Sequence, residues 1–238
     1  MGSRSLFGLG CCGKARIVCE QSWMPKFQRV SESLEHTSVI AKDFAAVLRR
    51  GDLVRLVGEM GAGKTTFVRE VAQALGVDVS MVSSPTFVLM NNYPCLIQGD
   101  PGSIAHLDCY RFGDADELDA LGWDRVCADG SIRLVEWPER IDEMLGEELS
   151  CTVTISHVDE EVRGFVFDVP ESWMERASAM ALKARDGVKC PVTGEAVHPE
   201  SPSWPFVSEQ ARMSDLHGWM SEKFSITRPI EQADLDQE

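Results

Sequence analysis

Hydrophobic positions along the chain switch between the alternating spacing of strands and the three-to-four-residue spacing of helices. The first clear helical pattern spans 37–51, where apolar positions fall close to helical spacing and a glycine suits the end. A short buried strand over 52–58 and a helix over 64–75 follow, with a glycine-rich loop between them. A chain that alternates strands and helices in this way is expected to adopt an α/β fold.

The remaining elements are placed by the same patterns. Strands are predicted over 26–33, 84–93, 103–111 and 131–137, and a terminal hairpin over 150–158 and 162–169 around an acidic turn. Short helices are predicted over 114–123 and 138–145, the second with a proline in its first turn. Together these elements predict one layered α/β domain over residues 26–169, a sheet with flanking helices.

The pattern changes after residue 169. A linker helix is predicted over 170–187, followed by a Pro- and Ser-rich small module over 188–226 and an acidic tail over 227–238. Residues 1–25 are predicted to be a disordered leader, and an organellar transit peptide remains the alternative because this segment is basic and poor in acids. The domain boundary is therefore expected near residue 170.

Composition narrows the choice of partners. The chain of 238 residues has 38 acidic against 23 basic residues and a formal net charge of -15, so its surface repels nucleic-acid backbone. No stretch reaches the ~18 apolar residues of a membrane span, and no membrane partner is expected. The 8 cysteines are scattered without a C-x-x-C pair, which is typical of reduced residues in a cytoplasmic protein.

One loop carries a pattern with known chemistry. The pattern G-x-x-x-x-G-K-[ST] is matched in full by Gly58, Glu59, Met60, Gly61, Ala62, Gly63, Lys64 and Thr65. The glycines let backbone N–H groups turn toward phosphate oxygens, and the helix N-terminus adds a positive dipole end. Lys64 supplies a cation for the outer phosphates, and the Thr65 hydroxyl can ligate Mg²⁺. The loop predicts a nucleoside triphosphate site, the alternative being a structural glycine turn.

Magnesium in such a site needs a second anchor at the end of a hydrophobic strand. Asp108 follows one predicted strand and Glu136 ends another, although each taken alone could be an ordinary strand-end acid in solvent. No N-K-x-D stretch that would recognise guanine is present, so ATP is favoured over GTP.

Four stretches together resemble a known family. "GEMGAGKTTFVRE", "VSSPTF", "HLDCYRF" with "ELDALG", and "LVEWPER" occur in the order and spacing of the TsaE (YjeE) family, over about residues 30–168. Members are small bacterial ATPases that assist the biosynthesis of threonylcarbamoyladenosine in tRNA. The resemblance implies a chain that joins the TsaB–TsaD heterodimer and resets it between turnovers, meeting tRNA only through these proteins.

The resemblance also implies roles for single residues. Gly58 to Thr66 hold the phosphates, with Lys64 as the catalytic cation, and Thr86 faces the γ-phosphate. Thr65, Asp108 and Glu136 are the expected magnesium ligands, Asp108 directly or through water. Glu136 is expected to position or activate water, and Trp137 to pack beside the nucleotide. Without the resemblance, Thr86 could merely begin a strand and Trp137 could simply belong to the core.

Residues 188–226 are similar to a second family, the YacG zinc-ribbon inhibitors of DNA gyrase. Of the four cysteine positions of that family, this chain keeps Cys190 and has Thr193, Val207 and Ala211 at the others. The resemblance therefore implies a ribbon without its metal: no zinc is expected, and gyrase is not an expected partner. Such a module is expected to be held by apolar packing of Trp204, Phe206, Leu216, Trp219 and Phe224.

Two other functions remain open at this level. A P-loop kinase for a small molecule would use Asp108 as the substrate base, and a regulatory binding protein would act on gyrase through the C-terminal module. The joint occurrence of the four stretches favours a cytoplasmic ATPase of the TsaE type over both.

Overall fold

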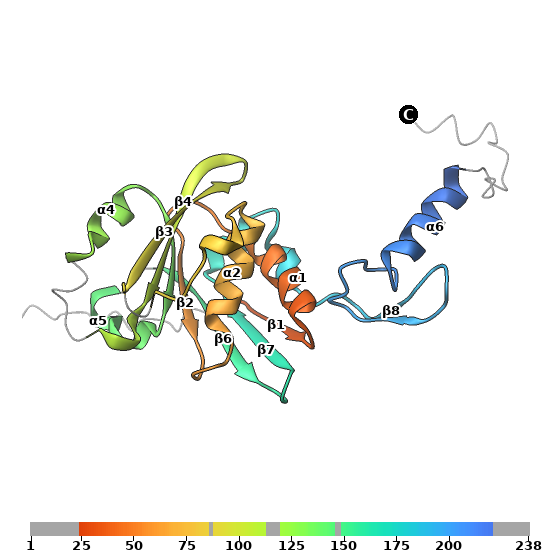
Figure 1. Ribbon diagram of the computed structural model, residues 1–238, viewed down its shortest axis with the longest axis horizontal. Coiled ribbons are helices and arrows are strands. Elements are labelled where there is room, and N and C mark those ends of the chain that lie inside the picture. Colours follow the sequence, from red (N-terminus) through yellow and green to blue (C-terminus); the bar gives the residue numbers. More distant parts are fainter. Residues whose placement is uncertain (1–23, 86–87, 113–119, 146–148, 221–238) are drawn as a thin grey trace, which may run out of the picture.

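The computed structural model describes residues 24–85, 88–112, 120–145 and 149–220 (Figure 1). Residues 1–23 of the predicted leader, Thr86, most of the predicted helix over 114–123, and the acidic tail lie outside these residues. In the part of the chain that is described, no helix is both long and apolar enough to cross a membrane.

A seven-stranded mixed sheet forms the centre of the α/β domain, in the order β1-β7-β6-β2-β5-β4-β3. Its strands are β1 (Lys26–Ser31), β2 (Leu53–Val57), β3 (Met90–Ile97), β4 (Asp100–Asp108), β5 (Ile132–Glu136), β6 (Ser150–His157) and β7 (Arg163–Asp168). The four central strands β6, β2, β5 and β4 are parallel, and the outer strands pair antiparallel. Every residue of β5 is buried, as expected of a parallel strand covered on both faces. The predicted α/β class is confirmed.

Helices cover both faces of this sheet (Figure 1). On one face, α1 (Leu34–Ala45) and α2 (Lys64–Ala74) pack together over a core that contains Phe44, Phe67 and Phe167. On the other face, α4 (Trp123–Ala128) and α5 (Asp142–Leu145) cover a second apolar cluster. The central strands are therefore held between two hydrophobic layers, which fixes the carboxyl ends of β2, β4 and β5.

Several predicted elements are displaced in the structure. α1 begins at Leu34 rather than at residue 37, because the Ser33 side chain caps it by accepting from the His36 N–H. The strand predicted over 84–93 is instead β3 at Met90–Ile97, and Leu89 just before it has a φ of 65°, which ends extended backbone there. The helix predicted over 138–145 is divided into a 3₁₀ turn at Pro138–Arg140 and α5. The sequence patterns did not predict α4.

The linker helix predicted over 170–187 is wrong. The segment forms two 3₁₀ turns, Glu171–Glu175 and Ala179–Leu182, that pack back on the α/β domain. Trp173 is buried with its ring 6.3 Å from that of Phe44, and Arg176 forms an ion pair with Asp52 at 2.6 Å. Burying Trp173 and Leu182 against the sheet layer outweighs the local helix propensity of this segment.

The C-terminal module stands apart from the sheet (Figure 1). It contains a short hairpin of β8 (Val188–Lys189) and β9 (Ala196–Val197), followed by α6 (Glu209–Met220). Buried Cys190, Val197 and Ala211 form its small core, against which half-buried side chains pack: Val188, Trp204, Phe206 and Val207.

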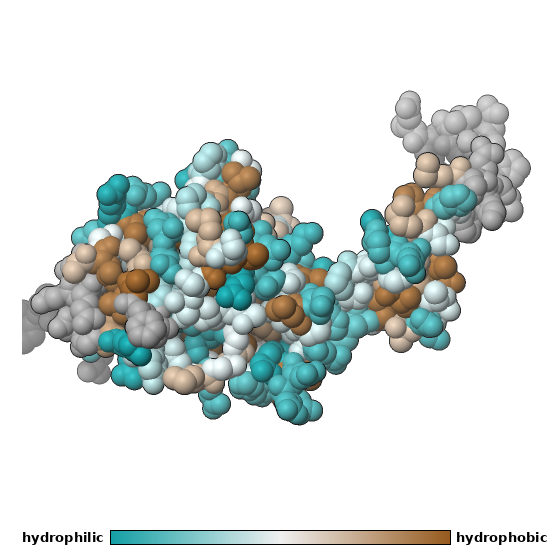
Figure 2. All heavy atoms as spheres, in the orientation of Figure 1, coloured by the Kyte–Doolittle hydropathy of each residue, from teal (hydrophilic) through white to brown (hydrophobic). Residues whose placement is uncertain are grey.

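The expected apolar packing of the C-terminal module is correct only in part. Trp204 and Phe206 join the core, but Leu216 and Trp219 are 49% and 61% exposed, and Phe224 lies outside the described residues. Ala211 is the buried residue of α6, so this helix contacts the module through its first turn and leaves later apolar positions on the surface. Figure 2 shows hydrophobic side chains at the surface of the module, as it does on parts of the α/β domain.

Candidate nucleotide-binding site

The phosphate loop, residues 58–66, connects the carboxyl end of β2 to the first turn of α2. Gly58 is required by a close approach, since a Cβ there would lie 2.4 Å from the Ile155 carbonyl oxygen of β6. Gly63 caps α2 with a φ of 106°, a conformation that L side chains rarely adopt. Its carbonyl accepts from the Phe67 N–H at 2.8 Å, which begins the helix. The strand–loop–helix context that the pattern requires is present.

Lys64 folds back over the loop. Its Nζ donates to the carbonyl oxygens of Gly58 at 2.7 Å and Glu59 at 2.9 Å, and lies 3.9 Å from the centroid of the Trp137 ring. Burial lowers the pKa of Lys64, and the nearby carboxylates of Glu136, Glu139 and Asp108 oppose that change. A cation held by neutral carbonyls inside a cavity is well placed to move onto a phosphate oxygen.

The two strand-end acids lie together beside the loop. β4 and β5 pair in parallel with Asp108 opposite Glu136, and Glu136 is opposite Leu56 of β2. Both carboxylates are almost completely buried, and Glu136 Oε1 accepts from the Thr65 hydroxyl at 2.8 Å. Asp108 accepts from the Tyr110 N–H at 3.1 Å. Parallel pairing therefore brings Asp108 and Glu136 to one edge of the sheet, where the first turn of α2 adds Thr65.

His106 was not predicted as part of this site. Its fully buried ring lies with Nε2 2.9 Å from Glu136 Oε1, while Nδ1 has no partner among the described residues. The signal was present in the sequence, because His106 precedes Asp108 by two residues and so shares its face of β4. The imidazole and the Thr65 hydroxyl therefore contact the same oxygen of Glu136 and together hold its carboxylate.

A cavity of about 480 Å³ opens at this edge of the sheet. The predicted residues that line it are Met60, Gly61, Gly63, Lys64, Thr65, Thr66, Asp108, Glu136 and Trp137. Ser84, Tyr110 and Arg111, which were not predicted, line it as well. The volume and the mixture of hydroxyl, carboxylate and cationic groups are suitable for a polyphosphate.

Trp137 occupies a turn directly after β5. Its φ of 58° places the ring over Lys64 and 5.1 Å from the ring of Tyr110. The same side chain packs against the core cluster on the α4 face. Trp137 therefore both lines the cavity and contributes to the core, which were the two alternatives drawn from the sequence.

A second cavity of about 480 Å³ lies on the other side of the phosphate loop. It shares Gly61, Gly63 and Thr66 with the first cavity and is otherwise lined by the first turn of α1 and the turn between β6 and β7. Ala62 faces this second cavity, whereas Gly58 and Glu59 line neither. Two neighbouring spaces of this size can hold the two ends of a nucleotide.

Parallel strands with this loop between β2 and α2 define the class of P-loop proteins. Residues 31–165 match the family model described as threonylcarbamoyl adenosine biosynthesis protein TsaE, so more than half of the chain is matched. The chain belongs to the TsaE family.

Individual relatives agree with this assignment. The TsaE protein of Streptomyces coelicolor is 39% identical over 128 residues, which are 52% of this chain and 84% of that protein. The TsaE protein of Aquifex aeolicus is 40% identical over 112 residues, covering 47% of this chain and 76% of that protein. The crystal structure of Bacillus subtilis YdiB is 26% identical with a TM-score of 0.52, covering 67% of this chain and 95% of that one.

The C-terminal module is matched by a second family model. Residues 188–237 match DNA gyrase inhibitor YacG, which supports the fusion of two families in one chain. At the positions where the resemblance places metal donors, Cys190 and Ala211 are buried in one apolar cluster with half-buried Val207 beside them. A closed zinc site needs four nitrogen, sulfur or oxygen donors, and these residues do not fit one.

Cys190 nevertheless keeps a polar environment for its sulfur. Burial raises the pKa of its thiol, but hydrogen bonds from the Thr193 hydroxyl and from the backbone N–H groups of Thr193, Val207 and Val192 outweigh it and lower the pKa to about 7. The turn that would surround a metal-binding cysteine in the ribbon family is therefore retained here, although Cys190 is the single thiol left at these positions.

Proposed function

We propose that this chain binds and hydrolyses Mg-ATP as an assisting protein in tRNA N6-threonylcarbamoyladenosine modification. The observation that carries the proposal is the convergence of Lys64, Thr65, Asp108 and Glu136 on one cavity, in a chain of the TsaE family. The relatives are all named as tRNA threonylcarbamoyladenosine biosynthesis proteins, which favours neither a small-molecule kinase nor a gyrase regulator.

In this proposal the triphosphate lies along the phosphate loop. The outer phosphates enter the cavity that contains Lys64, and the nucleoside extends past Thr66 into the second cavity beside α1. Backbone N–H groups of the loop and the N-terminus of α2 face the phosphates, and Lys64 exchanges its carbonyl partners for phosphate oxygens. Thr86, which lies outside the described residues, is proposed to approach the γ-phosphate.

Magnesium is assigned to the hydroxyl of Thr65 and the carboxylates of Asp108 and Glu136. This is an all-oxygen donor set of the kind that Mg²⁺ prefers, and two of its members are already hydrogen-bonded to each other. The ion, when bound, neutralises charge on the phosphate oxygens.

Hydrolysis then depends on the buried acid. Glu136 is held by Thr65 and His106, so its free carboxylate oxygen can orient a water molecule for attack on the γ-phosphorus. Attack forms a P–O bond from water to the γ-phosphorus and breaks its bond to the β–γ bridging oxygen, which leaves with ADP. The water proton passes to Glu136 or to an oxygen of the γ-phosphate. Lys64 stabilises the negative charge of the transition state.

The proposed partners are TsaB and TsaD. An acidic chain with a formal net charge of -15 is suited to contacts with proteins rather than to direct capture of tRNA. We assign no structural zinc to the ribbon positions of the C-terminal module and no role in gyrase inhibition, since three of its four donors are absent.

The decisive experiment is retention of TsaB and TsaD by the immobilised full chain, with and without Mg-ATP. We expect nucleotide-dependent retention by the wild-type chain and by Glu136→Gln, which keeps ATP intact, and none by Lys64→Ala. ATP hydrolysis by the chain alone should be slow and should rise when both partners are added. Fast hydrolysis by the chain alone, or equal retention by Lys64→Ala, would contradict the assisting role.

A further inference from the structure

The C-terminal module is fixed to the α/β domain by buried charged groups. Arg29 of β1, whose side chain is inaccessible to solvent, donates to both carboxylate oxygens of Glu200 and at 2.9 Å to Asp43 of α1. Its remaining nitrogen donates to the Ala181 carbonyl at 2.9 Å, and Arg185 reaches Asp43 at 3.0 Å. An arginine with every nitrogen engaged holds the segment around Glu200 in one position.

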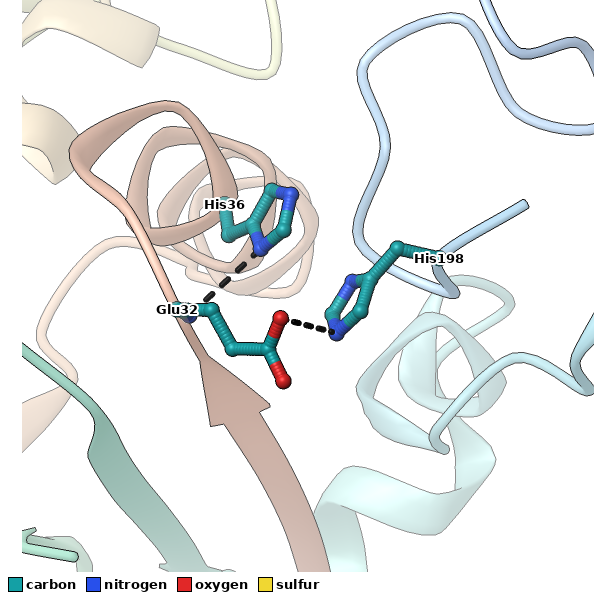
Figure 3. A group of neighbouring side chains, drawn as sticks. All are labelled: Glu32, His36 and His198. Carbon is teal, nitrogen blue, oxygen red and sulfur yellow. Dashed lines mark hydrogen bonds and ion pairs between the residues drawn. The ribbon is translucent and has the colours of Figure 1, made fainter. Parts of the chain in front are cut away.

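Beside this contact, two imidazoles and a carboxylate from the two parts of the chain face one another (Figure 3). Glu32 and His36 come from the junction of β1 and α1, and His198 comes from the module. His198 Nε2 lies 3.6 Å from Glu32 Oε2, and one donor atom from each of the three residues lies within 4.8 Å of the others. The site is partly open to solvent, which leaves it accessible to an ion.

We propose that Glu32, His36 and His198 bind a divalent transition-metal ion of the Zn²⁺ class, which links the C-terminal module to the α/β domain. Two ligands placed at ~2.1 Å from a tetrahedral ion are about 3.4 Å apart, close to the separation of the Glu32 and His198 donors. Two imidazoles and one carboxylate select zinc or a similar ion over Mg²⁺ or Ca²⁺, which take oxygen ligands. Three protein ligands leave one position for water.

Binding requires one side-chain rotation and the loss of one hydrogen bond. The rings of His36 and His198 are stacked at 4.1 Å with 10° between their planes, so one ring must turn about its Cβ–Cγ bond before both lone pairs meet at one point. His198 Nδ1 now accepts from the Glu200 N–H at 3.1 Å, and an ion at Nε2 releases that contact because the ring proton moves to Nδ1. Both rings are only half-buried, and the backbone beneath them stays fixed by Arg29.

The present contact of His36 also leaves room for an ion. His36 Nδ1 is engaged only by a long contact of 3.4 Å from the Glu32 N–H, and little is lost when an ion replaces it.

The proposed site differs from the ribbon positions in both donors and origin. The ribbon positions surround the sulfur of Cys190 within the module, whereas the junction offers nitrogen and oxygen from both parts of the chain. Cobalt distinguishes the two, because a thiolate ligand adds an intense charge-transfer band that nitrogen and oxygen ligands do not give.

The test uses the full chain after removal of metal ions, in excess Mg²⁺ to occupy the oxygen sites. Zn²⁺ is titrated by calorimetry and Co²⁺ by absorption. We expect one equivalent without a thiolate band, binding weakened roughly tenfold or more by His36→Ala, His198→Ala and Glu32→Gln, and a Zn²⁺-dependent rise in melting temperature that His198→Ala abolishes. His217→Ala, which removes an exposed imidazole of α6, and Cys190→Ser serve as matched controls and should bind as the wild type does.

Three results would overturn the proposal. These are absence of Zn²⁺ binding by the wild-type chain, binding that none of the three junction variants weakens, and a thiolate band that disappears in Cys190→Ser. Circular dichroism of each variant shows whether it is folded. Glu32→Gln changes an exposed side chain and keeps the test valid if either histidine variant unfolds.

Discussion

The phosphate loop and the turn around Cys190 each match the pattern of a known family. The loop keeps both the backbone and the functional side chains of its family, whereas the turn keeps mainly the backbone. At the phosphate loop the glycines, the cation and the hydroxyl are all retained, and Lys64 and Thr65 line one cavity with two acids. Around Cys190 the backbone turn and its N–H groups are retained, while Val207 and Ala211 stand where donors are expected. A retained backbone pattern therefore predicts a fold, whereas only retained donor atoms predict which ligand is bound.

The phosphate loop and the C-terminal module are therefore held in place by different interactions. The loop is fixed from outside by parallel strands and by α2, so its polar groups are free to meet a ligand. The module has a core of three small buried side chains and relies on Arg29–Glu200 for its attachment. Five substitutions test this contrast.

Replacing Glu136 by Gln should reduce the turnover of ATP by about 1000-fold while changing nucleotide affinity little, because the amide cannot take a proton from water. Phosphate release and calorimetry on the same samples measure the two quantities. Glu139→Gln, which alters an exposed acid three residues away, is the control and should retain full turnover. Equal losses of affinity and turnover would show that Glu136 acts only through the bound ion and not on the attacking water.

Replacing Lys64 by Ala should weaken Mg-ATP binding roughly 100-fold, since the outer phosphates lose a charge-assisted contact inside a cavity. Calorimetric titration with a non-hydrolysable analogue measures this. Lys42→Ala removes an exposed cation from α1 and should bind as the wild type does. An unchanged affinity in Lys64→Ala would rule out the cavity as the phosphate site.

Replacing Glu200 by Ala should lower the free energy of unfolding by about 2 kcal/mol, because buried Arg29 loses two hydrogen bonds to a charged partner and keeps only Asp43 and Ala181. Urea denaturation measures the change. Glu195→Ala, an exposed acid of the same module, should leave stability unchanged. A Glu200→Ala chain as stable as wild type would show that the module is not anchored here.

Replacing His106 by Asn should reduce turnover about tenfold without changing the KM for ATP, because the imidazole orients Glu136 and does not touch the nucleotide. Steady-state kinetics separate the two constants. A purely structural role would instead lower the melting temperature and leave turnover per folded molecule unchanged.

The α/β class and most of the candidate site could be predicted from the sequence. Buried strands and the loop pattern are local, and parallel pairing then forces Asp108 and Glu136 to one edge of the sheet. His106 was missed although it shares the face of Asp108, because a histidine in an apolar strand is usually a core residue.

The segment after residue 169 could not be predicted in the same way. Its helical pattern is real, but the positions of Trp173, Arg176 and Leu182 are decided by partners more than 100 residues away in the chain. The contact of Glu200 with Arg29 spans 171 positions and leaves no periodic signal. Long-range partners of this kind determine how the module is attached and lie beyond any local pattern.

The smallest expected effect concerns the pH dependence of the module. The pKa of Cys190 falls from 9.0 in the unfolded chain to about 7 in the folded one, so the folded state favours the thiolate. Its contribution to stability is fully present above about pH 9 and is lost as the pH falls through about 7. Urea denaturation is measured for the wild type and for Cys190→Ser, in reductant, at several pH values between those limits. The difference between their free energies of unfolding isolates the contribution of the thiol, because the other titrating groups cancel in that difference. We expect the wild-type chain to gain stability over Cys190→Ser as the pH rises, and parallel curves would show that the retained turn no longer stabilises a thiolate.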